Sequence, residues 1–173
     1  YNVYELNIAD TLSKALTSST KESFFAVNFL PQNNKFLYSA DKGGDENSHL
    51  YLKSESDTSA RDLTPWPKST NSFFGWSADK KSMYVISNNR NPQFFDLWKL
   101  DTASWKPVLI YQNDSGLDPG GISKSERYIA LTKSITSDKN ELYLFDAKNK
   151  KMTRISNDNE ATWNPMAFEK NDS

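Results

Sequence analysis

A polar loop, Asp41-Lys42-Gly43-Gly44-Asp45-Glu46-Asn47, places three carboxylates within six positions. Carboxylate oxygens are ligands that Ca²⁺ prefers, so this loop has the residue types of a calcium site. Its spacing does not follow the EF-hand pattern, and a short motif alone is weak support for a metal. The two adjacent glycines permit positive φ angles, which favours a flexible turn with solvated acids. We therefore predict neither a metal nor a cofactor here.

Histidine occurs once in the chain, at His49. A Ser-His-Asp site needs a base beside its nucleophile, and the G-x-S-x-G turn that presents such a serine is missing. The nearest string, Gly75-Trp76-Ser77-Ala78-Asp79, lacks the second glycine. His49 lies in a polar loop next to a predicted strand, where we expect a plain surface residue. The sequence therefore predicts that this chain has no catalytic residues and is not itself an enzyme.

Arg90 stands in the polar string Asn88-Asn89-Arg90-Asn91-Pro92. Its planar guanidinium suits bidentate contact with a carboxylate, either of a peptide or of another domain. A solvated surface arginine is the competing interpretation. Arg90, Asp45 and Glu46 are our candidates for contact with a substrate or partner.

Apolar residues around these polar segments recur with a period in the mid-forties. Residues of one series are 47 and 45 positions apart: Leu50, Leu97 and Leu142. Residues of a second series are 47, 46 and 46 positions apart: Phe29, Trp76, Ile122 and Phe168. Short apolar or alternating runs, rich in aromatic and β-branched residues and cut by polar turns, indicate strands rather than helices. Four such strands per period are typical of a β-propeller blade.

The predicted fold is therefore all-β, a partial β-propeller of about three complete four-stranded blades and two partial ones. The whole chain, 1–173, is one propeller segment with a half-blade at 1–17, blades at 20–65, 69–112 and 116–158, and the start of a further blade at 161–173. The predicted strands of the complete blades are 24–29, 36–40, 49–53, 61–64, 73–76, 83–87, 96–100, 107–111, 119–122, 127–133, 141–145 and 152–155.

At the two ends, the repeat predicts incomplete blades. We expect Tyr4 and Leu6 to correspond to Leu50 and Leu52, and a lone strand at 163–168. Unpaired strand edges can pair with other chains, so self-association through the open ends is expected. The first residue, Tyr1, is not a methionine, which indicates a piece of something longer.

Composition excludes several classes of partner. The 21 basic and 22 acidic residues are balanced, with no basic stripe, which argues against nucleic-acid binding. No apolar run is long enough to cross a membrane. Cysteine is absent, and this is tolerated in reducing and oxidising compartments alike, so the sequence does not distinguish periplasm from cytoplasm.

The repeat FGWSADKKSMYVISNNRNPQFFDLWKLD resembles the propeller repeats of TolB-like and prolyl oligopeptidase family proteins, in which a W-S-x-D-G-K turn joins the first two strands. Here Lys80 stands in place of the glycine. The strings SADKGGDENSHLYL, RDLTPW and NNRNPQFFDLW look most like the N-terminal propeller of bacterial prolyl oligopeptidase family serine peptidases. The resemblance covers nearly the whole chain.

The resemblance implies a non-catalytic propeller that gates and selects peptide substrates for an α/β-hydrolase domain absent from this chain. The alternative is a TolB-like propeller acting as a protein-binding scaffold in the bacterial envelope. In the resembled peptidases the loops between the second and third strands face the catalytic domain, which here are 41–48, 88–95 and 134–140. We therefore expect Arg90→Ala to alter peptide turnover or domain docking with a nearly unchanged melting temperature.

Overall fold

The computed structural model describes residues 1–157, 162–165 and 168, and its regular elements there are all strands. This confirms the predicted all-β fold, a partial β-propeller. In this described part no helix is long and apolar enough to cross a membrane. The chain divides into two compact units, Tyr1–Phe73 and Phe74–Ser173, which we describe separately.

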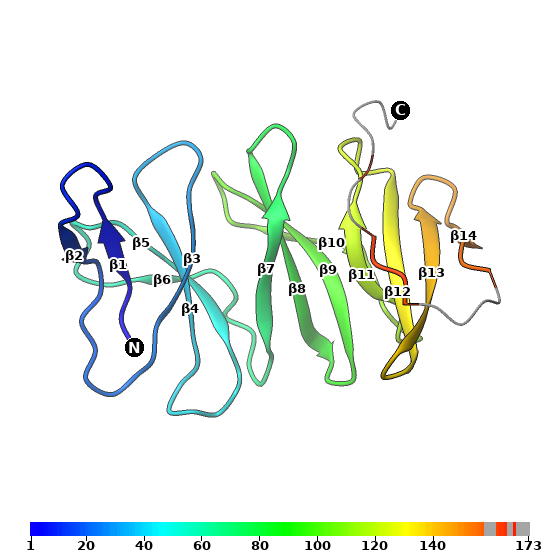
Figure 1. The fold of residues 1–173 in the computed structure, drawn as a ribbon, viewed down its shortest axis with the longest axis horizontal. Helices are drawn as coiled ribbons and strands as arrows, with labels where there is room; N and C mark the ends of the chain where they lie inside the picture. The colour runs from blue at the N-terminus through cyan, green and yellow to red at the C-terminus, as the bar shows by residue number, and fades with distance from the viewer. Residues whose placement is uncertain (158–161, 166–167, 169–173) are drawn as a thin grey trace. The chain divides into compact units, whose positions relative to one another are not determined.

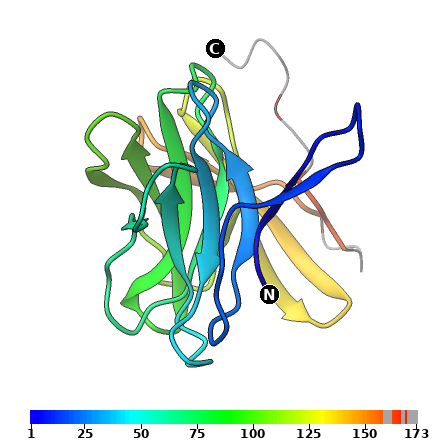
Figure 2. The same cartoon turned by 90° about the vertical axis from the view of Figure 1, so that its left-hand side faces the viewer.

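Unit 1 contains a hairpin and one four-stranded antiparallel sheet (Figure 1). The hairpin pairs β1 (Tyr4–Leu6) with β2 (Ser13–Ala15), and Figure 2 views the unit from the side of this hairpin. The sheet has the order β3 (Phe25–Phe29), β4 (Phe36–Ala40), β5 (His49–Lys53) and β6 (Arg61–Asp62). Consecutive strands are neighbours, which is the meander of a propeller blade.

Two further four-stranded meanders follow along the chain. The first contains β7 (Asn71–Trp76), which crosses the boundary between the units, β8 (Ser82–Asn91), β9 (Phe94–Asp101) and β10 (Pro107–Tyr111). The second contains β11 (Asp118–Ile122), β12 (Tyr128–Thr136), β13 (Lys139–Asp146) and β14 (Lys151–Arg154). Each predicted strand of the complete blades overlaps one of the observed strands.

Two of the predicted loops are largely strand. Residues 88–95 and 134–140 extend the β8–β9 and β12–β13 hairpins, with turns at 92–93 and 137–138. The prediction of long loops was wrong because it depended on apolar residues, whereas a ladder is held by backbone hydrogen bonds that polar residues also make. Residues 41–48 do form a loop.

The predicted register of the first hairpin was wrong by one residue. Val3, which is 5% exposed, takes the place of Leu50, whereas Tyr4 and Leu6 are each 60% exposed. Successive side chains of a strand point to opposite faces, so a shift of one residue exchanges the buried and exposed sets. Of the predicted strand at 163–168, residues 163–165 and 168 carry no strand, and 166–167 lie outside the described residues.

The apolar core of each unit lies between one blade and the preceding strands. In unit 1, the hairpin residues Val3 and Leu16 pack with Phe36, Tyr38 and Ala40 of β4. In unit 2, residues of two neighbouring sheets form the corresponding cluster: Tyr84, Leu97, Tyr111, Ile129 and Leu131. Aromatic rings fill these interfaces, as in the stacked pair of Tyr38 and Tyr51, whose centroids are 5.3 Å apart.

In three strand pairs, a hydroxyl group just after the last strand accepts a hydrogen bond from the backbone of the strand before it. The backbone N–H groups of Val3, Leu50 and Leu142 donate to hydroxyl oxygens 14 residues later, those of Thr17, Thr64 and Ser156. The backbone bonds from Leu16 to Val3 and from Leu63 to Leu50 lie beside them. These bonds establish that Val3, Leu50 and Leu142 are equivalent positions of the repeat.

Candidate functional site

The hairpin or loop between the second and third strands of each sheet is bonded to the segment that leaves the fourth strand. In unit 1, Thr70 Oγ1 donates to the Glu46 carbonyl at 3.0 Å and Asn71 Nδ2 donates to the Ser48 carbonyl at 2.9 Å. In the last sheet, Thr162 Oγ1 donates to the Asp138 carbonyl at 2.7 Å. Antiparallel strands place these two kinds of connection at the same end of a blade, and the bonds hold them together there.

Arg90 is the corresponding link in the β7–β10 sheet. Its Nε and Nη2 atoms donate to the two carboxylate oxygens of Asp96 at 2.9 and 3.1 Å, and Nη2 also reaches the Asn113 carbonyl at 2.8 Å. Asp114 Oδ1 lies 2.8 Å from the same Nη2. Asp96 is fully buried, while the Arg90 side chain is 31% exposed. The guanidinium therefore neutralises a buried carboxylate and leaves about a third of its surface to solvent.

The network continues beyond Arg90. Asp96 Oδ1 accepts the backbone N–H of Asn113 at 2.7 Å, and Asn113 Nδ2 donates to Asp118 Oδ1 at 3.0 Å. Burial raises the pKa of Asp118 above its usual value. In this sheet a side chain of the third strand thus accepts a hydrogen bond from the segment after the fourth strand, whereas in the other strand pairs a hydroxyl group after the last strand accepts one from the preceding strand.

The other two candidates lie in the exposed loop of unit 1. Asp45 Oδ1 accepts the backbone N–H of Asn47 at 3.0 Å, and hydrogen bonding to Asn47 lowers the Asp45 pKa. Glu46 has a φ of 61°, and its backbone N–H donates to Asp41 Oδ2 at 3.3 Å. The two carboxylates are neighbours in one loop, whereas Arg90 belongs to unit 2. Among the described residues, no group of three or more histidine or acidic side chains is arranged to hold a metal ion.

A pocket of about 430 Å³ adjoins this loop, and Asp45, Asn47, His49, Tyr51 and Asp62 contribute to its wall. His49 Nδ1 lies 2.7 Å from Asp62 Oδ2, and the imidazole is stacked on Tyr51 with a centroid distance of 6.3 Å. The His49 side chain is only 19% exposed, so the expectation of a plain surface residue was wrong. Among the described residues, those that line this pocket include no serine.

Sequence reasoning overlooked a signal shared by three sheets. A titratable residue directly precedes each repeat leucine, and each has an oppositely charged or chargeable partner: His49 with Asp62, Asp96 with Arg90, and Glu141 with Arg154. A polar residue at a buried position of a repeat needs a partner, because an unpaired one is costly. The signal was available in the sequence as the residues before Leu50, Leu97 and Leu142.

The sequence family described as prolyl oligopeptidase, N-terminal beta-propeller domain, matches residues 12–169. Dipeptidyl aminopeptidase BIII from Pseudoxanthomonas mexicana is 34% identical over 104 residues, which cover 60% of this chain and 15% of that protein. The chain thus matches only a small part of the length of this relative.

Solved structures share the fold at low sequence identity. TolB from Acinetobacter baumannii has a TM-score of 0.59 and 15% identity, over 90% of this chain and 37% of that one. A structure from a study of two prolyl endopeptidases has a TM-score of 0.60 and 13% identity, over 86% of this chain and 22% of that one. With the family match spanning residues 12–169, this chain belongs to the N-terminal β-propeller domain family of prolyl oligopeptidases.

Proposed function

We propose that this propeller domain gates and selects peptide substrates for a serine peptidase of the prolyl oligopeptidase family. Chemistry would be supplied by an α/β-hydrolase domain elsewhere in the protein, and this domain would be the propeller's partner. The family match carries the proposal. Similarity to a dipeptidyl aminopeptidase supports a peptide as the substrate class.

The geometry supports a particular face for this role. In each sheet the connection after the second strand is tied to the exit of the fourth strand, as in the Glu46–Thr70 and Arg90–Asn113 bonds. Such ties give the loops of this end fixed positions, which a surface that selects substrates requires. Asp45 and Glu46 stay exposed there and offer negative charge to a peptide or to the catalytic domain.

Arg90 is a poor probe of this face. Its removal would leave the buried carboxylate of Asp96 without its cation, so Arg90→Ala should lower the melting temperature. This differs from the expectation drawn from the sequence. The exposed acids are better probes, because substitutions at exposed positions usually change stability by less than about 0.5 kcal/mol.

The test uses the complete peptidase and one peptide sequence in two forms, free and held within a folded domain. We expect turnover of the free peptide only, and a change in kcat/KM for it in the double variant Asp45→Asn, Glu46→Gln. The control is Lys35→Gln, an exposed position in the turn at the opposite end of the same sheet. Equal turnover of both peptide forms would contradict gating.

A separate outcome of the same experiment would contradict the proposed functional face. If Lys35→Gln changes kcat/KM and the acidic double variant does not, the functional face is the opposite one. The alternative is a TolB-like scaffold. TolB from Acinetobacter baumannii is only 15% identical to this chain, so the similarity supports a common fold and no common function. A protein without peptidase activity that retains a protein partner would favour that alternative.

A further inference from the structure

Two polar atoms in one pocket of unit 1 have no hydrogen-bond partner among the described residues. The pocket is the cavity of about 430 Å³ beside the 41–48 loop, here called the His49 pocket. The two atoms are His49 Nε2 and Tyr51 Oη, which belong to rings stacked with a centroid distance of 6.3 Å. Neither atom is sealed from solvent in the described part of the chain. Both are therefore open to a ligand in the pocket.

The surroundings determine what each of these atoms can do. A carboxylate only accepts hydrogen bonds, so the 2.7 Å contact with Asp62 Oδ2 places a proton on His49 Nδ1. The neutral imidazole then has Nε2 as an acceptor. Burial and nearby carboxylates raise the pKa of Tyr51, so its hydroxyl keeps its proton and can donate. The pocket thus offers one acceptor and one donor.

The corresponding tyrosine of the last sheet has its acceptor within the chain. Tyr143 follows the repeat leucine directly, as Tyr51 does, and its hydroxyl donates to Glu141 Oε2 at 2.6 Å. Glu141 also pairs with Arg154 at 3.0 Å. In unit 1, His49 stands at the position of Glu141, so the tyrosine hydroxyl loses this carboxylate. An open donor in one copy of a repeat, where the other copy is bonded, requires an explanation, and a ligand carbonyl would supply the acceptor.

The charged side chains of the His49 pocket favour a neutral ligand. Lys42 and Lys68 bring two ammonium groups to its wall, and Asp45 and Asp62 bring two carboxylates. Opposite charges in equal number give no net attraction for an ion. A peptide backbone is neutral and carries a donor and an acceptor at each residue other than proline.

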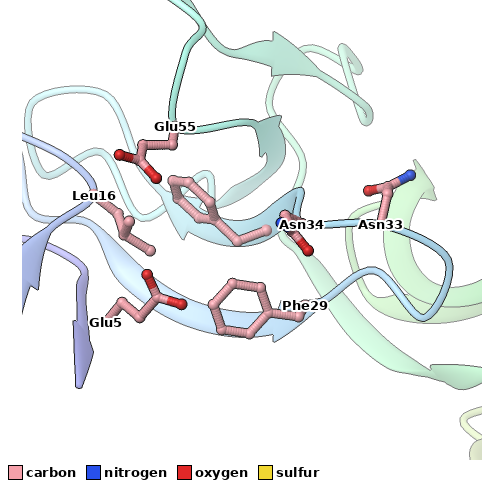
Figure 3. A pocket seen from close by; sticks show the side chains of 7 residues that line it. Glu5, Leu16, Phe29, Asn33, Asn34 and Glu55 are labelled. Atoms are coloured by element: carbon pink, nitrogen blue, oxygen red, sulfur yellow. The ribbon is translucent and has the colours of Figure 1, made fainter. Parts of the chain in front are cut away.

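Charged groups at the two blade interfaces, in contrast, are offset within the chain. In unit 2, Lys99 Nζ lies 2.6 Å from Glu126 Oε1. Figure 3 shows the pocket of about 300 Å³ at the unit 1 interface, where Glu5 and Glu55 lie beside apolar side chains. Lys14 pairs with Glu55 and faces Glu5 across the β1–β2 ladder.

We propose that the His49 pocket binds one residue of an extended peptide. The residue donates its backbone N–H to His49 Nε2, and its backbone C=O accepts the Tyr51 hydroxyl. These two groups of one residue point to the same side of an extended chain, as in a hydrogen-bonded pair of antiparallel strands. The contact reads the backbone and not the side chain. It rests on the proposed function, for which it names a contact to an unfolded peptide substrate.

The donor is tested by NMR titration of this chain with N-acetyl-alanine N-methylamide. We expect saturable binding with a dissociation constant of about 10 mM. Tyr51→Phe removes the hydroxyl and should weaken binding at least about threefold. The matched control is Tyr38→Phe, which should bind normally, since Tyr38 is stacked on Tyr51 outside the pocket. Full affinity in Tyr51→Phe, or an equal loss in Tyr38→Phe, would overturn the proposal.

The acceptor is tested with a matched ligand. O-acetyl-lactic acid N-methylamide has an oxygen atom in place of the alanine N–H, and should bind at least about threefold more weakly. His49→Phe keeps a ring against Tyr51 and should abolish this preference, with circular dichroism to verify the fold. Equal binding of the two ligands by the unaltered chain would overturn the proposal. Tighter binding of N-acetylalanine, which has a free carboxylate, would also overturn it and assign the pocket to an anion.

Failure of this site and failure of gating are separate results. If the chain does not bind the blocked alanine while the complete peptidase turns over only the free peptide, the proposed function stands and the inference about the His49 pocket is wrong. If the complete peptidase turns over both peptide forms equally while the chain binds the blocked alanine through Tyr51, gating is wrong and the site stands.

Discussion

The two blade interfaces described within the units share an apolar core but differ in their polar rim. Val3 and Leu16 pack on β4 in unit 1 as Leu97 and Tyr111 pack on β12 in unit 2. The rim of the second interface is closed by Lys99 and Glu126, whereas the first leaves a pocket beside Glu5. The two interfaces thus have apolar residues at the same positions of the repeat, whereas their rim residues differ in charge. Residues outside the core can vary on a common fold.

The largest expected effect is the loss of unfolding free energy when a core leucine is replaced. Leu97 is fully buried, so Leu97→Ala should cost about 2 to 5 kcal/mol of unfolding free energy. Leu142 is at the equivalent position but is half-buried, so Leu142→Ala should cost less. Denaturant unfolding of both variants checks this. Equal costs would show that burial in the interface does not distinguish the two positions.

The Lys99–Glu126 pair at the rim of the unit 2 interface should contribute less to the unfolding free energy than the core. Glu126→Gln removes the carboxylate that Lys99 and Tyr84 share, and should cost about 1 to 3 kcal/mol. Burial, with a further contribution from the Glu126 hydrogen bond, raises the pKa of Tyr84, and the variant should lower that pKa. A spectrophotometric tyrosine titration follows it. An unchanged titration and unchanged stability would show that the ion pair of Lys99 and Glu126 does not stabilise this interface.

Two turns with the same backbone strain allow a finer test. Lys80 and Glu126 both have a φ of 61°, and Lys80 stands where the resembled turn has glycine. Lys80→Gly should stabilise by up to about 1 kcal/mol, because glycine adopts this conformation without steric cost. Glu126→Gly relieves the same strain and loses the ion pair, so it should destabilise. If both variants change thermal stability in the same direction, the pair with Lys99 does not outweigh the strain.

The smallest expected effect depends on pH. Hydrogen bonding from Arg127 lowers the pKa of Asp146 from 3.8 to about 2. A depressed folded-state pKa gives stability that is present above pH 3.8 and is lost as the pH falls through about 2. Arg127→Gln should therefore flatten the melting temperature profile in this window. A profile parallel to that of the unaltered protein would contradict the role of the pair.

Much of the fold follows from the sequence because its signals are local. The spacing of Leu50, Leu97 and Leu142 and the alternating runs predict the sheets correctly. The register of the first hairpin could not be predicted, because Val3, Tyr4 and Leu6 are all apolar and only the bond from Val3 to Thr17 decides among them. Apolarity alone does not identify the buried face of a short edge strand.

The candidate site was less accessible to prediction. Asp45 and Glu46 lie in an exposed loop as expected, but their contact with a substrate or partner stays a prediction. The partners of Arg90 are 6, 23 and 24 positions away along the chain, and the pairing of β8 with β9 and of β9 with β10 brings them together. Pockets formed by hairpin and sheet, such as that beside Glu5, likewise depend on side chains from separate strands and turns.

We infer that the two interfaces have corresponding core positions and differ in their rim residues. The most direct test is a double-mutant cycle of Glu5→Lys and Asn33→Glu, which copies Lys99 and Glu126 into unit 1. We predict a favourable coupling of about 0.5 to 1 kcal/mol in denaturant unfolding, as for exposed ion pairs, and its loss at high salt. Strict additivity of the two substitutions at low salt would contradict the equivalence of the interfaces.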